Sequence, residues 1–290
     1  MNNIWSTYIQ KIDTLYSSRT LRFSDLFKEK YTNFFEIGNG KKILEIGCGP
    51  GALSQALSRW YPDSEIIGTD RDTAFIEFAK KQAPHITFTE EDATNLSFAD
   101  NTFDVTISNT VAEHIEPSKF FGEQYRVLKQ GGVCLVLSGR KGVNISAPCI
   151  EEQTDFESEI WSRAEKRFSE SLERYSVCQY PMSETQYPAC MEKYGFKNVS
   201  TEYITVNLTP DNPVYPKEIA HAMINSNRQN DINAVQLLED IASDIVTQEE
   251  VQELMRQVNL KYDRRIELYD KGIKQWDTNV SVTMMIRGIK

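Results

Sequence analysis

The chain has 290 residues, of which 40% are hydrophobic and 26% are charged, a composition typical of a folded globular protein and not of a fibrous or disordered one. The formal net charge of −10, from 32 basic and 42 acidic residues, argues against a large nucleic-acid interface and against attraction to anionic lipid. Five cysteines without a C-x-x-C pair and only three histidines predict reduced thiols in the cytoplasm and no metal site. The N-terminus has no signal-peptide pattern and nowhere do about 18 apolar residues run together, so we expect neither secretion by that route nor a membrane span.

Residues 1–36 have the pattern of one or two amphipathic helices. Short apolar runs then alternate with helical patterns up to residue 138, which is typical of βαβ units wound into a parallel sheet. The helices between the runs are marked by Pro62 at an end, Asp72 at a cap, Pro117 in a first turn and Gly131-Gly132 at an exit. The predicted strands are Lys42–Ile46, Glu65–Thr69, Ile86–Thr89, Phe103–Ser108 and Val133–Ser138.

Beyond residue 138 the pattern changes. Residues 145–182 are polar and charged, without strand alternation, and predict a helix around Glu157–Arg174. Two β-branched, alternating runs at 198–208 and 279–289 predict two more strands, side by side at one edge of the sheet. Residues 216–275 between them predict two amphipathic helices, separated where Thr247 and Glu250 match a capping box. The whole pattern predicts a doubly wound α/β fold with a mostly parallel, seven-stranded sheet and helical insertions.

A glycine-rich loop joins the first predicted strand to the helix that follows it. Gly47, Gly49 and Gly51 let the backbone turn sharply and let a ligand approach the main chain, while the helix start offers free N–H groups. Asp70, nineteen residues after Gly51, ends the second strand, where a carboxylate can accept both hydroxyls of a ribose. The alternative role for Asp70 is a helix cap, which Asp72 can fill instead.

Polar residues also end the third and fourth strands. Asp92, in the acidic run that begins at Glu90, can accept from the exocyclic amine of an adenine, and a solvated surface is the alternative reading of that run. The fourth strand ends at Ser108-Asn109-Thr110, beside the first strand in a sheet of this type, so it borders the crevice where ligands bind. His114 is the histidine best placed to act as a general base, and a packing role is its alternative.

The glycine spacing permits two kinds of ligand. Gly47-x-Gly49-x-x-Ala52 also satisfies the dinucleotide pattern G-x-G-x-x-G/A. Pro50 removes one backbone donor, however, and Glu45 places a carboxylate next to where a diphosphate would lie. A ligand with a positive centre suits Glu45 better, while a nicotinamide-dependent oxidoreductase and a non-catalytic cofactor-binding protein remain the alternatives.

The run Leu44–Gly51 resembles motif I of the class I S-adenosylmethionine-dependent methyltransferases. The resemblance covers residues 41–140, through Gly68-Thr69-Asp70, Glu91-Asp92-Ala93, Phe103-Asp104-Val105 and Leu128-Lys129-Gln130-Gly131-Gly132. It implies a Rossmann-like fold, S-adenosyl-L-methionine as the cofactor, and methyl transfer to a small-molecule acceptor by in-line displacement.

The resemblance also implies roles for single residues. Glu45 and the Gly47–Gly51 loop, which includes Cys48, would hold the methionine part of the cofactor. Asp70 would hold the ribose, and Asp92 with Ala93 the adenine, which Arg71 would flank. Asn109 and Thr110 would lie near the methionine end of the cofactor. An arginine of the N-terminal helix, Arg22 or Arg19, would contact the cofactor carboxylate.

We therefore expect five parts in the chain. An N-terminal helical lid, the cofactor-binding core and a helical insertion would be followed by the rest of the sheet, itself interrupted by a second insertion that covers the acceptor pocket. In chain order these parts are residues 1–36, 37–144 and 145–182, then 183–215 with 276–290, and 216–275 as the cover.

Overall fold

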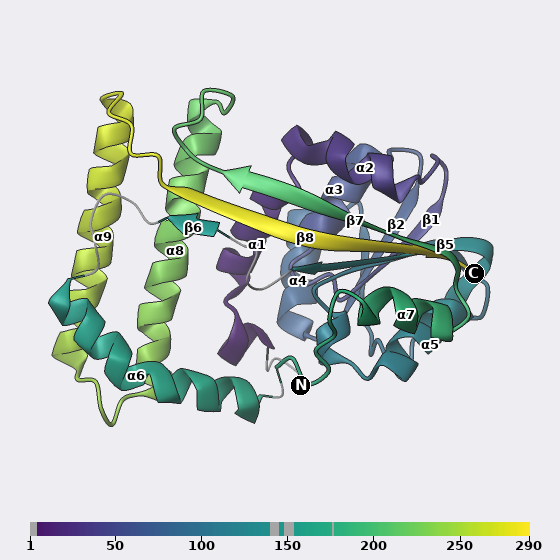
Figure 1. The fold of residues 1–290 in the computed structure, drawn as a ribbon, viewed down its shortest axis with the longest axis horizontal. Coiled ribbons are helices and arrows are strands. Elements are labelled where there is room, and N and C mark those ends of the chain that lie inside the picture. The colour runs from purple at the N-terminus through teal and green to yellow at the C-terminus, as the bar shows by residue number, and fades with distance from the viewer. Residues whose placement is uncertain (1–4, 140–144, 148–153, 176) are drawn as a thin grey trace. The chain divides into compact units, whose positions relative to one another are not determined.

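The computed structural model describes residues 5–139, 145–147, 154–175 and 177–290, and Figure 1 draws its elements. The chain divides into two compact units. We call residues 1–143, 178–206 and 281–290 the sheet unit, and residues 144–177 and 207–280 the helical unit. Most of both expected insertions therefore falls into one unit.

The strands of the sheet follow the predicted ones closely. They are β1 (Lys42–Ile46), β2 (Glu65–Asp70), β3 (Thr87–Glu90), β4 (Phe103–Asn109), β5 (Leu128–Gly139), β7 (Lys197–Leu208) and β8 (Thr278–Ile289). Their order is β3-β2-β1-β4-β5-β8, and β7 pairs with β8. Neighbours from β3 to β5 run parallel, whereas β8 runs antiparallel to β5. The predicted doubly wound, mostly parallel α/β fold is confirmed.

One short strand was not predicted. β6 (Ile145–Ala147) pairs antiparallel with residues 278–280 of β8 and adds an eighth strand at the start of the segment 145–182. Its three residues are too few to display the period-two alternation by which a strand is recognised in sequence.

The predicted boundary at Gly131-Gly132 is wrong. Helix α5 (Pro117–Val127) ends before Leu128, where β5 begins, so the two glycines lie inside a strand and not at a helix exit. The β4–β5 register shifts between the pairs Phe103↔Leu128 and Val105↔Val133, so extra residues bulge from β5. Gly131 has φ +78°, a left-handed conformation that favours glycine and lets the strand absorb the bulge.

Apart from the end of α5, the helices of the sheet unit begin and end near the predicted signals. Asp72 caps α4 by accepting from the backbone N–H groups of Ala74 and Phe75, and Pro117 occupies the first turn of α5. The remaining helices are α1 (Ile12–Arg22), α2 (Lys28–Phe35), α3 (Ala52–Trp60), α4 (Thr73–Gln82), α7 (Gln186–Lys193) and three short ones at Trp5–Ile9, Asp25–Phe27 and Ala112–His114.

The ligand crevice of such a sheet lies where the strand order reverses. β1 lies between β2 and β4, and Ile46 at its end is level with Thr69 of β2 and Ser108 of β4. The chain leaves β1 toward β2 and later returns to β4, so the loops that follow β1 and β4 diverge at this edge. The glycine loop and the Ser108–Thr110 segment therefore belong to one edge of the sheet.

The helical unit has a hydrophobic core of its own. Its helices are α6 (Asp155–Arg174), α8 (Lys217–Ile241) and α9 (Gln248–Asp270). The predicted capping box at Thr247 and Glu250 starts α9, and an equivalent box at Thr154 and Glu157 starts α6. The apolar stripes of the three helices pack on one another through Ile160, Ala164, Ile224, Val235, Leu238, Val251, Leu254, Val258 and Tyr262.

A buried ion cluster joins the segments before α8 and after α9. The side chain of Arg265 is fully buried, with Nε 2.7 Å from Asp277 Oδ1 and Nη2 2.8 Å from Asp211 Oδ2. Asp211 also accepts hydrogen bonds from the backbone N–H groups of Gln275 and Trp276, both at 2.8 Å. One guanidinium thus holds both ends of the α8–α9 hairpin.

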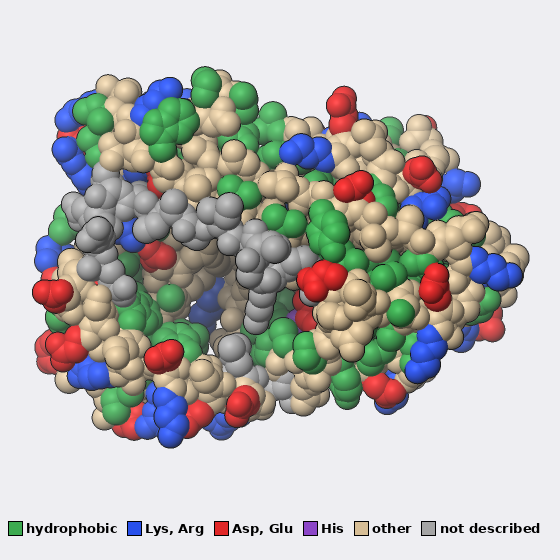
Figure 2. Space-filling model, in the orientation of Figure 1, with side chains coloured by type: hydrophobic (Ala, Val, Ile, Leu, Met, Phe, Trp, Pro, Cys, Tyr) green, Lys and Arg blue, Asp and Glu red, His purple; other side chains and the backbone are tan. Residues whose placement is uncertain are grey.

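Figure 2 shows acidic and basic side chains interspersed over the visible face. Within the described ranges, no helix combines the length and the apolar composition needed to cross a bilayer.

Candidate functional site

The loop after β1 is built from three glycines in left-handed conformations. The φ angles of Gly47, Gly49 and Gly51 are +68°, +52° and +85°, and Gly51 is the N-cap of α3. A Cβ at Gly47 would lie 2.4 Å from a methyl carbon of Val111, and one at Gly51 would lie 3.0 Å from Ala79. Backbone conformation and close neighbours thus require glycine at Gly47 and Gly51. The N–H groups of Cys48, Gly49 and Gly51 donate within the protein, to Thr69, Asp70 and Cys48 in that order.

Asp70 is bonded directly to this loop. Its Oδ2 accepts from the backbone N–H of Gly49 at 2.9 Å, and its Oδ1 accepts from the N–H of Asp72 at 2.9 Å. Burial raises the pKa of Asp70 above its ordinary value. Since Asp72 caps α4, the capping alternative for Asp70 is settled in favour of Asp72, and Asp70 is a loop-bound carboxylate at the end of β2.

Glu45 is a buried acidic residue, the last but one of strand β1, just before the glycine loop. Its side chain is 2% exposed and accepts a hydrogen bond from the hydroxyl of Ser54 on α3. Burial raises the pKa of Glu45 to about 8, and the nearby charge of Asp70 adds to the shift. The sheet unit therefore holds a carboxyl group that is largely protonated at neutral pH and that a neighbouring cation would ionise.

Helix α1 brings one of the two candidate arginines to this edge. Arg19 Nη2 donates to the side-chain oxygen of Thr110 at 3.1 Å, whereas Arg22 Nη1 donates to the backbone oxygen of Ser18 in its own helix. Burial lowers the pKa of Arg19 to about 10, so the guanidinium is partly desolvated but still charged at neutral pH. A Cβ at Gly49 would lie 3.4 Å from Leu15 of α1, which shows that the helix covers the glycine loop.

The short helix Trp5–Ile9 is fixed over the same edge. Ser6 donates to both carboxylate oxygens of Asp72, from its N–H at 2.8 Å and from its hydroxyl at 2.9 Å. The ring of Trp5 contacts the ring of His114 edge-on, with centroids 4.6 Å apart. The first described residues of the chain are thus anchored to β2–α4 and to the segment after β4.

His114 makes contacts typical of a packed, neutral imidazole. Its Nδ1 accepts from the backbone N–H of Cys178 at 2.9 Å, which places the proton of the neutral ring on Nε2. Burial lowers the pKa of His114 to about 4, and the positive charge of Arg71 adds to this shift. These contacts favour the packing role over the general-base role, because the lone pair that would receive a proton is already engaged.

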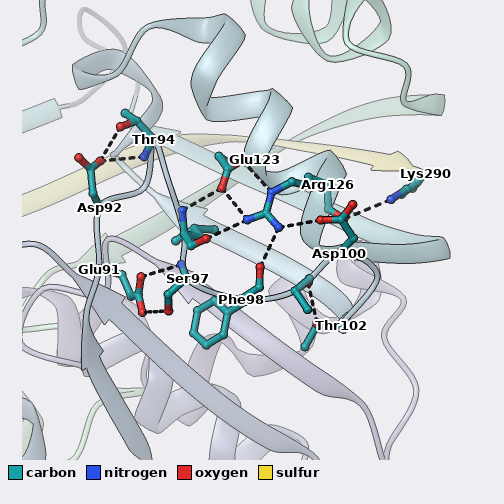
Figure 3. Close-up of polar contacts among 12 residues, drawn as sticks. Glu91, Asp92, Thr94, Ser97, Phe98, Asp100, Thr102, Glu123, Arg126 and Lys290 are labelled. Carbon is teal, nitrogen blue, oxygen red and sulfur yellow. Dashed lines mark hydrogen bonds and ion pairs between the residues drawn. The ribbon is translucent and has the colours of Figure 1, made fainter.

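Glu123 and Arg126 of α5 hold the loop after β3, a role that the sequence pattern did not predict. Asp92 accepts from the N–H and hydroxyl of Thr94, both at 2.8 Å (Figure 3). Arg126 of α5 donates to the backbone oxygens of Leu96 at 2.9 Å and Phe98 at 2.7 Å, and pairs with Glu123. Glu123 and Arg126 are three residues apart, which in sequence looks like an ordinary exposed helix pair.

The remaining candidate residues differ in how deeply they are buried. Cys48 is buried within the glycine loop, and burial raises its thiol pKa well above the ordinary value. Ala93 packs on the core of the sheet unit, and Arg71 is exposed. Ser108, next to the end of β4, has a buried hydroxyl with no hydrogen-bond partner among the described residues.

Comparison with known proteins gives a family for the core of the sheet unit. Residues 44–136 match the family described as "Methyltransferase domain". This segment is similar to methyltransferase domains. It contains the glycine loop, Asp70, the loop after β3 and the end of β4.

Curated relatives match the chain over about a third of its length. A demethylmenaquinone methyltransferase from Paenarthrobacter aurescens is 38% identical over 96 residues, which are 32% of this chain and 36% of that protein. A phthiotriol/phenolphthiotriol dimycocerosates methyltransferase from Mycobacterium tuberculosis is 38% identical over 97 residues, with the same coverage. The match spans about a third of the length of these relatives.

A solved structure resembles the chain over nearly its whole length. Phosphoethanolamine N-methyltransferase 2 from Haemonchus contortus, in complex with S-adenosyl-L-methionine, has a TM-score of 0.53 at 16% identity over 99% of this chain and 59% of that one. At this identity the likeness supports the fold alone.

Proposed function

We propose that the chain is an S-adenosyl-L-methionine-dependent methyltransferase that acts on a small-molecule acceptor. The observation that carries the proposal is the buried carboxyl of Glu45, which pairs with no cation among the described residues. It lies beside a loop that needs glycine, within a segment that matches methyltransferase domains. A dinucleotide would bring a diphosphate to that carboxyl, whereas the methionine part of the cofactor brings an ammonium and a sulfonium. The polarity of the site therefore favours the second ligand.

The residues at the edge of the sheet fit the parts of this cofactor. Glu45 would face the cationic methionine end, and the guanidinium of Arg19, which contacts Thr110, would pair with the cofactor carboxylate. Arg22 suits this role less well, because its guanidinium donates to Ser18 of its own helix. Asp70 would accept from the ribose, and Asp92 with Ala93 would border the adenine beside Arg71. Asn109 and Thr110 would lie near the methionine end.

The chain's contribution to the reaction is mainly positional. When bound, the cofactor supplies a methyl group already activated by the positive sulfur. The glycine loop and Asp70 would fix its orientation, and α1 with the Trp5–Ile9 helix would exclude water from the edge of the sheet. A general base is needed only for acceptors that must lose a proton before attack, and the bonded His114 is a poor one in the geometry described here.

The helical unit is part of the same proposal. The α8–α9 insertion, within residues 216–275, would cover the acceptor pocket, since the methyltransferase domain ends before it and carries the cofactor motifs by itself. We place the protein in the cytoplasm, which fits the free thiols of Cys48, Cys134 and Cys190.

Calorimetry with S-adenosylhomocysteine and with NADH tests the proposal. The full chain should bind S-adenosylhomocysteine and not NADH. Gly47→Ala should weaken the binding at least about tenfold. The left-handed backbone conformation is unfavourable for alanine, and its Cβ would clash with the side chain of Val111. Gly122→Ala is the matched control, since a Cβ there has nothing within 4 Å. Tight NADH binding, or equal S-adenosylhomocysteine affinity in both variants, would reject the assignment.

A further inference from the structure

One face of helix α1 carries two arginines over the edge of the sheet where the cofactor is proposed to bind. Arg19 follows Leu15 by four residues and Arg22 follows Arg19 by three, so the three side chains share a face of the helix. A Cβ at Gly49 would lie 3.4 Å from Leu15, and Arg19 Nη2 lies 3.1 Å from the hydroxyl of Thr110, just after β4. The face that covers the glycine loop is therefore also the cationic face of α1.

Neither guanidinium has an acidic partner among the described residues. Arg19 donates to the hydroxyl of Thr110, and Arg22 Nη1 donates to the backbone oxygen of Ser18 at 3.1 Å and to the Ser18 hydroxyl. A guanidinium has five N–H donors, so Nε and Nη2 of Arg22 keep three donors that no described residue accepts. The two cations of α1 thus differ from Arg265, which lies between two carboxylates.

The charges of the two arginines are incompletely compensated. Burial lowers the pKa of both, and the like charge of Arg22 adds to the shift of Arg19. The charge of Glu113 acts against the shift of Arg19, whereas no carboxylate of the described chain does so for Arg22. Of the two cations, Arg22 is therefore the one more in need of an anion.

The proposed cofactor would supply an anion for only one of them. Its methionine part has a single carboxylate, which we assign to Arg19, and its ammonium and sulfonium are positive and face Glu45. The carboxylate of Asp70 is bonded to the backbone N–H groups of Gly49 and Asp72. In the complex, Arg22 would thus remain a half-buried cation without a partner, a feature typical of a further ligand site.

We propose that the methyl acceptor carries an oxyanion, either a carboxylate or a phosphate group, and that Arg22 binds it. This inference rests on the proposed function and names the class of its acceptor. Nε and Nη2 of Arg22 would donate to two oxygens of the anion. The oxyanion positions the acceptor and is not the atom that is methylated, because the guanidinium engages its lone pairs. Another atom of the acceptor bonds the methyl carbon as the carbon–sulfur bond breaks, so the product keeps the negative charge of the oxyanion.

Calorimetry with inorganic phosphate, on the full chain saturated with S-adenosylhomocysteine, tests the anion site directly. The wild type should bind phosphate, and Arg22→Gln should bind it at least about tenfold more weakly, the size expected for hydrogen bonds to a charged group. Arg22→Lys should retain part of the affinity, because it keeps the charge but not the paired donors. The matched control is Arg59→Gln, since Arg59 is already paired with Asp25 at 3.2 Å, and this variant should bind phosphate as the wild type does.

Transfer of a labelled methyl group into a small-molecule extract tests the acceptor itself. The labelled product should be retained by an anion-exchange column. Arg22→Gln should raise the KM for the extract at least about tenfold and change kcat less, because Arg22 binds the acceptor and takes no part in bond formation. Phosphatase treatment of the extract before the reaction separates the two kinds of acid. Loss of the labelled anion identifies a phosphate ester, and its survival identifies a carboxylate.

Three results would each overturn the inference: no phosphate binding by the wild type, equal phosphate affinity in Arg22→Gln and the wild type, or a labelled product that anion exchange does not retain. Circular dichroism and urea unfolding check that Arg22→Gln is folded, and the loss of an uncompensated charge should not lower its stability.

S-adenosylhomocysteine affinity separates this inference from the proposed function. It should be unchanged in Arg22→Gln and at least about tenfold lower in Arg19→Gln, whose side chain we assign to the cofactor carboxylate. If the wild type does not bind S-adenosylhomocysteine, the proposed function fails. The phosphate titration, repeated without S-adenosylhomocysteine, then still decides whether Arg22 holds an anion.

Discussion

The two units bury charge in opposite ways. In the sheet unit, the buried carboxyl of Glu45 meets a hydroxyl and backbone but no cation, and its pKa is raised to about 8. In the helical unit, the buried guanidinium of Arg265 lies between two buried carboxylates at distances of 2.6 to 2.8 Å. A compensated charge of this kind stabilises a particular arrangement of the chain, whereas an uncompensated one is a feature of sites that await a ligand.

The largest effect should come from removing the guanidinium of the compensated cluster. Arg265→Ala leaves Asp211 and Asp277 buried without a cation, which should destabilise the helical unit by about 3–5 kcal/mol. Urea unfolding followed by circular dichroism measures the loss. Arg264→Ala is the matched control, because its side chain is 50% exposed and its ion pair with Glu267 should contribute at most about 1 kcal/mol. Equal losses of stability in the two variants would show that the buried ion cluster does not stabilise the helical unit.

The uncompensated carboxyl should appear in the pH dependence of stability. The pKa of Glu45 is about 8 in the folded chain against 4.5 as its ordinary value, so the folded state holds an extra proton between these two values. Its contribution to stability is complete below about pH 4.5, decreases by up to about 1.4 kcal/mol per pH unit in between, and is lost above about pH 8.

Glu45→Gln isolates this contribution. The glutamine keeps a polar contact to Ser54 but has no proton to lose, so the difference in stability between wild type and variant should change steadily from about pH 5 to about pH 8. Urea unfolding at several pH values measures it. His114 has the opposite sign, since its lowered pKa gives stability that is lost as pH falls from about 6.5 toward about 4. A pH-independent difference would mean that Glu45 is ionised in the folded chain.

The sequence predicted the sheet unit better than the helical unit for a physical reason. The ends of β1 and β2 and the cap at Asp72 follow from local rules, since apolar periodicity and capping act over a few residues. Arg265, in contrast, meets Asp211 from 54 positions away, and no local pattern connects them. The contact of Arg19 with Thr110 likewise depends on how α1 packs on the loop after β4.

Within the sheet unit, substitutions at Asp70 and Asp72 should affect different quantities, cofactor affinity and stability. Asp70→Ala removes a carboxylate bonded to the glycine loop and should cost about 1.5–3 kcal/mol of S-adenosylhomocysteine affinity, the range for hydrogen bonds to a charged group. Asp72→Ala removes the cap of α4 and should instead cost about 1 kcal/mol of stability. Calorimetry and urea unfolding on both variants measure the two quantities. If Asp70→Ala binds normally while folded, the ribose lies elsewhere.

The smallest effect on cofactor binding should come from the largest change to the chain. Removing α8 and α9 alone would expose Ile160 and Ala164 of α6, which pack on them, and would leave Asp211 and Asp277 without Arg265. The informative variant therefore replaces residues 154–175 and 209–277 together, each by a short Gly-Ser linker. Loop-closure entropy grows slowly with length, so the remaining strands can keep their pairing.

This variant tests whether the helical unit is a cover for the acceptor. S-adenosylhomocysteine affinity should stay within about twofold of wild type, since the residues proposed to hold the cofactor all belong to the sheet unit. Transfer of a labelled methyl group into a small-molecule extract should be lost, because the acceptor would no longer be held and shielded from water. Normal transfer by the folded variant would show that the helical unit does not cover the acceptor. Loss of S-adenosylhomocysteine binding with the sheet intact would instead show that the cofactor site depends on both units.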